Sequence, residues 1–306
     1  MAKISVVMAV YNGAATLAGT MESILAQTER DFELVVVDDG STDQTPALLM
    51  SYAQRDPRVR VISQANTGLT RALMRGCDEA TAEIVARHDC GDRSHPERLR
   101  KQHALLQSDA ELVLVSCDTA YLGPGGERLY VASGDGERVR HSLLHDGVAH
   151  IRGLTHHGTA MFRREAYTAA GCYRPQFRVA QDLDLWVRMA KLGAIAFVPE
   201  VLYEARIEVN AISAHRRTEQ IESARIALAL RDTPDEAARK ALLDQADTIA
   251  MSKRRHHRRS EARTLYFIAS CLRRERHPGW RSYARQALGR DPLLFRAWFL
   301  LLRPRR

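Results

Sequence analysis

The chain has 306 residues, of which 45% are hydrophobic, and a formal net charge of +8. This size and composition are those of a globular protein with one large domain or two ordinary ones. No apolar run approaches the roughly 18 residues of a membrane span, and the run at residues 4–10 is too short for a secretion signal. The five cysteines form no C-x-x-C pair, which predicts a reduced, cytoplasmic chain without a disulfide framework or structural zinc.

Positive charge is concentrated in the last third of the chain. Residues 215–306 hold 22 of the 45 Lys and Arg but only 10 of the 37 Asp and Glu, so this part carries +12 and residues 1–214 carry −4. Strand-like patterning also stops near Ala214. We therefore predict an α/β domain at 1–214 and a basic α-helical region at 215–306.

The first 90 residues alternate between strand and helix patterns. Short apolar runs are typical of strands in a parallel sheet, and segments with helical spacing, such as 14–27, lie between them. The predicted strands are 4–10, 32–37, 59–62 and 84–86. The order β-α-β-α-β-α-β predicts a mostly parallel sheet with helices on both faces.

Aromatic or acidic side chains, which can bind a ligand, follow three of these strands. Tyr11 follows the first strand, Asp38 and Asp39 follow the second, and Asp89 follows the fourth. The carboxyl ends of parallel strands border one crevice, where open α/β sheets bind ligands. The turn at 11–15 has a single glycine, so neither a G-x-G-x-x-G motif nor a P-loop is present. The crevice offers instead a ring for stacking a base, and carboxylates for a base, a ribose or a cation beside a diphosphate.

A structural interpretation of these residues is the alternative. Tyr11 would then be a core aromatic at a strand end, and Asp38 and Asp39 would only form turns.

The stretch EIVARHDCGDRSHPERL at residues 83–99 ends its strand in acids. Asp89 and Asp92 bracket a tight turn that points carboxylates at the crevice. Ser94 and Glu97 have the spacing of a capping box, with Pro96 tolerated in the first helical turn. The alternative is that both acids only cap the turn and face water.

The rest of the first domain is predicted to combine helices and strands. Adjacent His156 and His157 do not have a zinc spacing, and alternation along a strand puts them on opposite faces. Whether either contacts a diphosphate or a metal stays open. The predicted elements are a helix at 96–106, a strand at 112–116, a β-hairpin at 121–131, an edge strand at 148–152 and a strand led in by 156–162.

Several blocks of the sequence together resemble the family 2 glycosyltransferases of the GT-A fold. The blocks are SVVMAVYNGAATLAGTMESILAQTERDFELVVVDDGSTDQT, NTGLTRALMRG, RHDCGDRSHPERL, GTAMFRREAYTAAGCYRPQF and AQDLDLWVRMAKLG, and they cover about residues 3–204. The resemblance implies a GT-A-like, Rossmann-like α/β fold. It also implies inverting transfer of a sugar from a nucleoside diphosphate, here UDP, to a hydroxyl of a glycan or lipid-linked acceptor in cell-surface polysaccharide synthesis.

The resemblance further implies which residues bind the donor. Tyr11 matches the residue that stacks near the nucleobase, Asp39 matches the carboxylate that reads the base, and Arg71 is a cation for the diphosphate. The implied donor-binding set is Ala9, Val10, Tyr11, Asp38, Asp39, Asn66, Gly68 and Arg71, with Asn66 and Gly68 in the loop that closes over the nucleotide.

The implied metal site departs from the family pattern. The family's D-x-D-D run places a carboxylate five residues before the proline, and here that position is Gly91. A divalent cation, Mg²⁺ or Mn²⁺, would then be held by Asp89, Asp92, waters and mostly the donor diphosphate. We therefore expect it to bind weakly without nucleotide.

Asp182 is the implied catalytic base, because it matches the acid of the family's E-D pair, here Gln181-Asp182. A sugar hydroxyl is a poor nucleophile at neutral pH, and a base that takes its proton contributes roughly 10² to 10⁴ in rate. The alternative is that Asp182 caps its helix, and we rank Asp184 as structural. The competing functions are a non-catalytic nucleotide-sugar binder and a basic interaction protein that has reused the fold.

The basic region is predicted to form a series of helices. Its basic run at 253–259 and the apolar, tryptophan-bearing segment at 293–303 together suit a peripheral helix on an anionic membrane, at its cytoplasmic face. A solvated face plus the core helix of a small helical domain is the alternative, and nucleic-acid binding ranks third for want of a recognised motif. The predicted helices are 218–231, 234–249, 260–273, 280–288 and 293–302.

Overall fold

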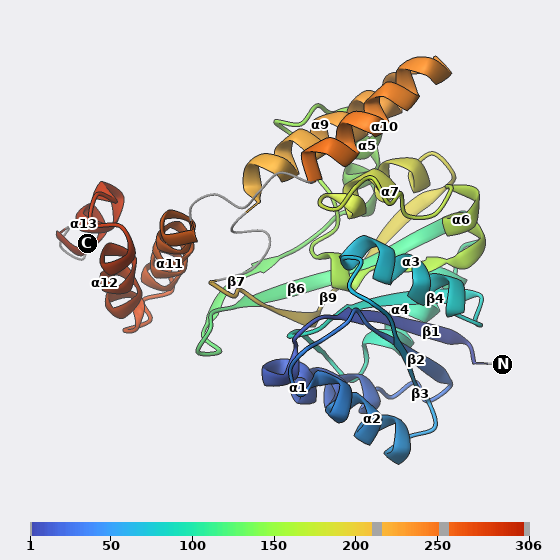
Figure 1. Cartoon of the computed structure of the whole chain (residues 1–306), viewed down its shortest axis with the longest axis horizontal. Coiled ribbons are helices and arrows are strands. Elements are labelled where there is room, and N and C mark those ends of the chain that lie inside the picture. Colours follow the sequence, from blue (N-terminus) through green and yellow to red (C-terminus); the bar gives the residue numbers. More distant parts are fainter. Residues whose placement is uncertain (1, 210–215, 251–256, 303–306) are drawn as a thin grey trace.

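One mixed β-sheet runs through the protein and has helices on both faces (Figure 1). The computed structural model describes residues 2–209, 216–250 and 257–302. Within these residues nine strands pair in the order β3-β2-β1-β4-β8-β6-β9-β5, and β7 pairs with β6. The strands are β1 (Ile4–Val10), β2 (Phe32–Asp38), β3 (Val59–Ser63), β4 (Ile84–Asp89), β5 (Arg93–Ser94), β6 (Leu112–Leu122), β7 (Arg128–Ala132), β8 (Met161–Arg163) and β9 (Ala194–Arg206).

The N-terminal part of the sheet is parallel, as predicted. Strand β1 lies between β2 and β4, and β3 continues the parallel order beyond β2. Strand β8 then runs antiparallel to both β4 and β6, which makes the remainder of the sheet mixed. The long β6 pairs in parallel with β9 and turns back into β7, which confirms the predicted hairpin.

Two apolar layers cover the sheet because successive side chains of a strand point to opposite faces. Val7 and Ala9 of β1 pack into one layer, and Val6 and Met8 pack into the other. Burial on both faces explains why β1 and β2 are almost continuously apolar. The first layer contains α3 (Leu69–Glu79), α5 (Gly136–His145), α6 (Arg164–Ala169) and α7 (Gln181–Met189), and the second contains α1 (Ala14–Leu25), α2 (Thr45–Arg55) and α4 (Arg98–Gln107).

The predicted edge strand at 148–152 is wrong. The backbone N–H of Ile151 donates to the carbonyl of Gly147 at 3.0 Å, so the chain turns here. Val148 and Ile151 still pack against the core from this turn. Two apolar residues three positions apart can share one side of a turn as well as they can lie in a strand, and the sequence pattern does not separate these cases.

The predicted capping box is also wrong. Ser94 lies in the short strand β5, paired with Tyr203 of β9, and its hydroxyl accepts a hydrogen bond from Arg98 at 3.0 Å. Glu97 is the N-cap of α4, and no side-chain hydrogen bond caps this helix in the described chain. The long-range pairing with β9 therefore overrides the local capping pattern.

The C-terminal helices occupy two places. Helices α9 (Arg217–Asp232) and α10 (Glu236–Ala250) pack around Phe177, beside α7. Helices α11 (His257–Arg274), α12 (Trp280–Arg290) and α13 (Phe295–Leu302) cluster on the β6–β7 hairpin, at the left of Figure 1. These five helices match the predicted ones.

Two sequence predictions about this region are not tested. The domain boundary near Ala214 and residues 253–256 of the basic run lie outside the described residues, and the division at 214 stays a prediction. Among the helices that the structure describes, none has the length and apolar character needed to cross a membrane.

Candidate active site

The residues predicted to line the crevice come together where β1, β2 and β4 end. In the parallel register Ala9 of β1 is paired with Asp89 of β4, and Val10 is paired with Asp38 of β2. Tyr11 and Asp39 follow directly, so the structure brings the strand-end residues to one edge of the sheet. Tyr11 is 53% exposed, so its ring is free of the core and able to stack on a ligand.

Asp39 ties the loop after β3 to the end of β2. Its Oδ1 accepts the backbone N–H of Thr67 at 2.9 Å, and its Oδ2 accepts the N–H of Gly68 at 2.8 Å. The side chain of Gln64 donates a further bond of 2.7 Å. The buried carboxylate therefore positions the loop that carries Asn66 and Gly68, whatever it also does with a ligand.

Of the other predicted donor-binding residues, Asp38 stabilises a turn, whereas Asn66 and Arg71 are exposed. Asp38 accepts the backbone N–H of Ser41 at 3.1 Å, so the turn-forming interpretation describes part of its role. Asn66 and Arg71 are exposed, at the loop and on the first turns of α3. Their side chains lie on the surface beside the crevice.

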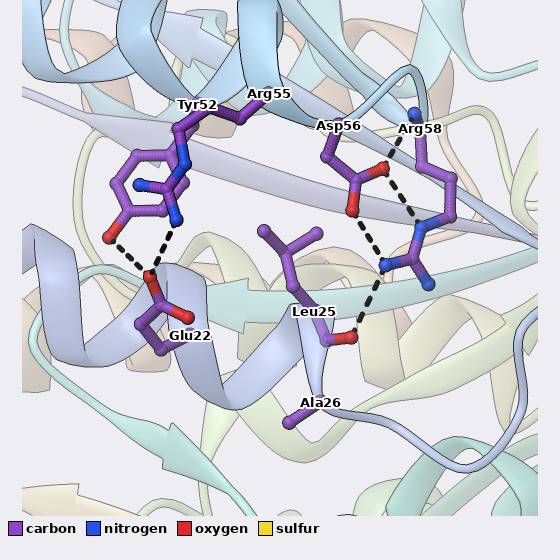
Figure 2. Close-up of a pocket in the computed structure, with 7 residues that line it drawn as sticks. All are labelled: Glu22, Leu25, Ala26, Tyr52, Arg55, Asp56 and Arg58. Carbon is purple, nitrogen blue, oxygen red and sulfur yellow. Dashed lines mark hydrogen bonds and ion pairs between the residues drawn. The ribbon is translucent and has the colours of Figure 1, made fainter.

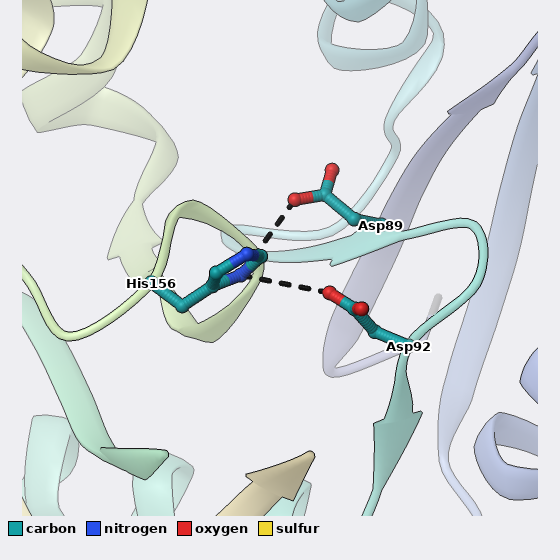
Figure 3. A group of neighbouring side chains, drawn as sticks. All are labelled: Asp89, Asp92 and His156. Carbon is teal, nitrogen blue, oxygen red and sulfur yellow. Dashed lines mark ion pairs between the residues drawn. The ribbon is translucent and has the colours of Figure 1, made fainter. Parts of the chain in front are cut away.

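An acidic cluster lies at the end of β4 (Figure 3). Asp89, Asp92 and His156 each place one potential ligand atom within 4.8 Å of the others. His156 Nδ1 lies 3.8 Å from Asp89 Oδ2 and 3.6 Å from Asp92 Oδ2. Asp92 is buried: its Oδ1 accepts the N–H of Arg206 at 3.0 Å, while its Oδ2 has no hydrogen-bond partner among the described residues. A buried carboxylate oxygen without a partner is unfavourable unless something else occupies the site.

Asp89 and Asp92 have very different pKa values, and Arg87 is a main reason for the difference. Burial disfavours the charge on Asp89, but the Arg87 guanidinium, which hydrogen-bonds this carboxylate, outweighs it and holds the pKa of Asp89 well below its usual range. Burial, reinforced by the negative charge of Asp89, raises the pKa of Asp92 to about 8. One acid is therefore ionised and the other resists ionisation until a positive charge arrives.

Gly91 has a structural reason to be glycine. Its φ is +103°, a conformation that residues with side chains rarely adopt. Thr20 closes the turn, because its hydroxyl accepts the N–H of Gly91 at 3.0 Å and donates to the carbonyl of Asp92 at 2.9 Å. The turn conformation therefore favours glycine at position 91, which leaves that position without a carboxylate.

The two adjacent histidines point to different surroundings. His156 faces the acids and stacks on Tyr203 with the ring centroids 5.4 Å apart. His157 instead shares a hydrogen bond of 2.8 Å with the hydroxyl of Tyr173. Burial lowers the pKa of His156 and lowers that of His157 to about 3, so both are neutral at pH 7. A neutral imidazole can ligate a metal, and only His156 is placed to do so.

Asp182 lies in the first turn of α7, close enough to the cluster for its charge to interact with Asp89. Burial raises the pKa of Asp182, the charge of Asp89 raises it further, and Arg87 opposes both. The N-cap of α7 is Ala180, so Asp182 is not the capping residue. A carboxylate with a raised pKa is a stronger base than an ordinary one.

Asp184 is structural, as expected. Its buried carboxylate accepts hydrogen bonds from Arg174 at 3.0 Å and from Arg188 at 2.6 Å. The ion pair with Arg174 holds α7 against the preceding loop, and the pair with Arg188 lies within α7.

Sequence reasoning missed Arg87 and Tyr203. A signal for Arg87 exists: a charged residue inside an otherwise apolar strand, two positions before Asp89 and therefore on the same face. Tyr203 accepts the backbone N–H of Asp89 at 3.1 Å, but it comes from β9, and no local pattern indicates that contact.

A surface pocket between α1 and α2 is separate from this site (Figure 2). It lies beside the last turns of both helices, which run back toward the amino ends of the strands, away from the crevice. Its charges pair with one another, Arg58 with Asp56 at 2.7 Å and Arg55 with Glu22 at 3.8 Å. We assign no ligand to it.

Known proteins share both the sequence and the fold. The profile of the family described as Glycosyl transferase family 2 matches residues 5–170. EpsE of Bacillus subtilis strain 168 is 33% identical over 227 residues, 72% of this chain and 79% of that protein. The amylovoran biosynthesis glycosyltransferase AmsE of Erwinia amylovora is 30% identical over 241 residues, 75% of this chain and 87% of AmsE.

Solved structures show the same fold at low sequence identity. TarS 1–349 of S. aureus in complex with UDP-GlcNAc has a TM-score of 0.58 and 16% identity, with 96% of this chain and 89% of that chain covered. The mannosyltransferase PcManGT of Pyrobaculum calidifontis, in complex with GDP-Man and Mn²⁺, has a TM-score of 0.56 and 19% identity, with 98% and 85% covered. The chain has the GT-A-type α/β fold and is an enzyme of the family 2 glycosyltransferases.

Proposed function

We propose that this enzyme transfers a hexose, with inversion, from a UDP-sugar to a hydroxyl of a glycan or lipid-linked acceptor in cell-surface polysaccharide synthesis. One observation supports this most: Asp89, Asp92 and His156 place potential ligand atoms within 4.8 Å of one another at the end of β4. Asp182 lies near enough to this cluster for the charge of Asp89 to raise its pKa. A base and an acidic cluster thus face one site. Transfer needs both, whereas nucleotide binding alone does not need the base.

The donor end of the site is the Tyr11 and Asp39 pair. The exposed Tyr11 ring can stack on a nucleobase. A carboxylate only accepts hydrogen bonds, so Asp39 suits the N3–H group of uracil. If the side chain of Gln64 moved away, a lone pair on Oδ1 of Asp39 would become free for that bond. Arg71, on the exposed start of α3, would meet the diphosphate.

The acidic cluster fits a divalent cation. Asp92 Oδ2 is buried without a hydrogen-bond partner in the part of the chain described, and oxygen ligands with one imidazole suit Mg²⁺ or Mn²⁺. Asp89, Asp92 and His156 would hold it, weakly until the nucleotide adds its own oxygens. When bound, the cation would neutralise charge on the departing diphosphate.

Asp182 would take the proton of the acceptor hydroxyl. Burial and the negative charge of Asp89 both raise the pKa of Asp182, so its carboxylate accepts a proton more readily than an ordinary carboxylate does. His157, neutral and bonded to Tyr173, would line the site without exchanging protons near pH 7.

The C-terminal helices would place the enzyme on the cytoplasmic face of an anionic membrane that carries its acceptor. Residues 257–302 contain 10 Arg and Lys against 3 Asp and Glu. On α13 the rings of Phe295 and Phe299 are 68% and 63% exposed, while Ala297 is buried against the neighbouring helices. A helix with one packed and one exposed apolar side, in a basic setting, suits the interface of such a membrane.

The second candidate is a nucleotide-sugar binder without catalysis, and Gly91 favours it by removing one acid. A panel of UDP-, GDP- and dTDP-sugars separates the two. We expect a UDP-sugar to raise the melting temperature and to be hydrolysed slowly with Mg²⁺ or Mn²⁺ present. A thermal shift without hydrolysis or transfer, under any cation, would instead support the binder.

A further inference from the structure

The carboxylate of Glu208 lies beside the position that Gly91 leaves without a side chain. A Cβ placed on Gly91 would be 3.8 Å from Oε1 of Glu208. The same Cβ would be 3.6 Å from the hydroxyl of Thr16, so Thr16 and Glu208 border the space that a side chain would enter. Glu208 thus brings a carboxylate, from 117 positions further along the chain, to where the family pattern has one.

Strand β9, which ends two residues before Glu208, holds Glu208 near the cluster. Strand β9 ends at Arg206, whose backbone N–H donates to Asp92 Oδ1 at 3.0 Å. Upstream, Tyr203 of β9 is paired with Ser94 of β5. The backbone two residues before Glu208 is therefore fixed to the acidic turn, while its exposed side chain keeps the freedom to move toward a ligand.

Of the acids around this point, Asp89 has a cationic partner in Arg87. Asp89, Asp92 and His156 each place a potential ligand atom within 4.8 Å of the others. Arg87 is already bonded to Asp89, and Asp92 Oδ2 is buried without a hydrogen-bond partner among the residues described. Like charges that converge on a partnerless buried oxygen are stabilised by a cation between them.

We propose that Glu208 is a cation ligand that replaces the carboxylate missing at Gly91, so that Asp89, Asp92, His156 and Glu208 together hold the divalent ion of the donor site. This inference rests on the proposed function. It explains how the turn keeps a glycine at φ +103° without losing an acid from the site. A side chain at position 91 would strain the turn by about 1–2 kcal/mol, whereas Glu208 reaches the same place from an unstrained strand end.

Mn²⁺ binding to the full chain tests the assignment. Calorimetry with saturating UDP, corrected for Mn²⁺ binding to UDP alone, gives the cation affinity of the wild type, Glu208→Gln and Glu208→Asp. Glu204→Gln is the matched control, because Glu204 is an exposed acid of β9, the strand that leads to Glu208, and is paired with Arg93. We expect Glu208→Gln to weaken Mn²⁺ by at least roughly tenfold, the lower end of what loss of even an outer-shell partner does, with partial recovery in Glu208→Asp.

The remaining outcomes are decisive too. UDP affinity measured in a chelator should be equal in all four proteins, because Glu208 acts through the cation. Glu208→Gln that binds Mn²⁺ as tightly as the wild type, or Glu204→Gln that loses as much, would overturn the assignment and leave the donor site standing. Absence of Mn²⁺ binding by the wild type with UDP would overturn this assignment together with the cation in the proposed function.

Discussion

The guanidinium of Arg87 donates a hydrogen bond to the carboxylate of Asp89, two residues further along β4. Arg87 has no solvent exposure, and it also donates to the carbonyls of Val7 at 2.9 Å and His88 at 2.8 Å. Residues two positions apart in a strand point to the same face, so the geometry of β4 brings these two side chains together. The pair keeps Asp89 ionised at the edge of the crevice, ready for a cation.

Replacing Arg87 by methionine should strongly destabilise the protein. The variant keeps most of the buried volume but removes the partner of Asp89 and three hydrogen bonds, and breaking a buried ion pair costs about 3–5 kcal/mol. Chemical unfolding measures this change. Arg87→Met combined with Asp89→Asn removes both charges, so we expect the double variant to recover part of the loss; equal stability of the wild type and Arg87→Met would contradict the role of the pair.

Asp182→Asn should lower turnover by a factor of roughly 10² or more, because asparagine keeps the size and most hydrogen bonds but cannot accept the proton. Donor affinity should scarcely move, since the lost interaction belongs to the transition state. Steady-state kinetics with the active donor, alongside calorimetry of UDP binding, measures both. Turnover within a few-fold of the wild type would show that another group is the base.

Asp39→Ala should weaken UDP by at least roughly tenfold, because hydrogen bonds to charged groups contribute about 1.5–3 kcal/mol each. Part of the loss would come from the loop at 64–68, which this carboxylate holds. Asp56→Ala is the control, since Asp56 also orders its surroundings through Arg58 but lies at the opposite edge of the sheet. Unchanged UDP affinity by calorimetry would remove Asp39 from the donor site.

Asp92 should make the cation-free protein less stable as pH rises from about 6.5 to 8. Its pKa in the folded protein is raised to about 8, so in this range the folded chain holds a proton that the unfolded chain has released. Stability then falls with rising pH, by about 1–2 kcal/mol over the window, and levels off above the folded pKa.

Unfolding in a chelator at several pH values, compared with Asp92→Asn, isolates this contribution. Below pH 6.5 the histidines lower the stability as pH falls. Burial lowers the pKa of His88 and His157 to about 3 in the folded protein, so in this range their side chains bind protons only in the unfolded chain. The histidines are present in both proteins, so their contribution cancels in the difference between wild type and Asp92→Asn, which should fall steadily as pH rises from about 4 to 8. A difference that stays flat up to pH 8 would show that Asp92 ionises normally.

Phe295→Ser with Phe299→Ser should reduce binding to anionic vesicles. The two exposed rings would insert while the surrounding bases, each contributing about 1 kcal/mol near the surface, hold the helix at the lipid. Sedimentation with phosphatidylserine-containing vesicles measures this, and wild-type binding should also fall as salt rises. Met50→Ser removes an exposed apolar side chain of α2 and should bind as the wild type does. Equal binding to neutral and anionic vesicles, or to neither, would contradict the proposal.

Local patterns predicted the parts of the structure that depend on local physics. The apolar runs of β1, β2 and β4 and the helices between them follow from burial on both faces of a parallel sheet, and the same order predicts that Tyr11, Asp39 and Asp89 share an edge. The five C-terminal helices follow from their spacing and breakers. Asp38, Asp39 and Asp89 were visible for the same reason, since each follows a predicted strand, whereas Asp182 was identified through the family resemblance.

Tertiary structure alone decided the contacts between distant segments. Nothing in the residues around Gly91 indicates that Glu208 lies beside it. Ser94 has the local spacing of a capping box, but in the structure it pairs with Tyr203 of β9. His156 and His157 differ only in which way a single-turn 3-10 helix points them, one to the acids and one to Tyr173. These outcomes depend on which distant segments meet in the fold, and a local sequence pattern carries no information about those contacts.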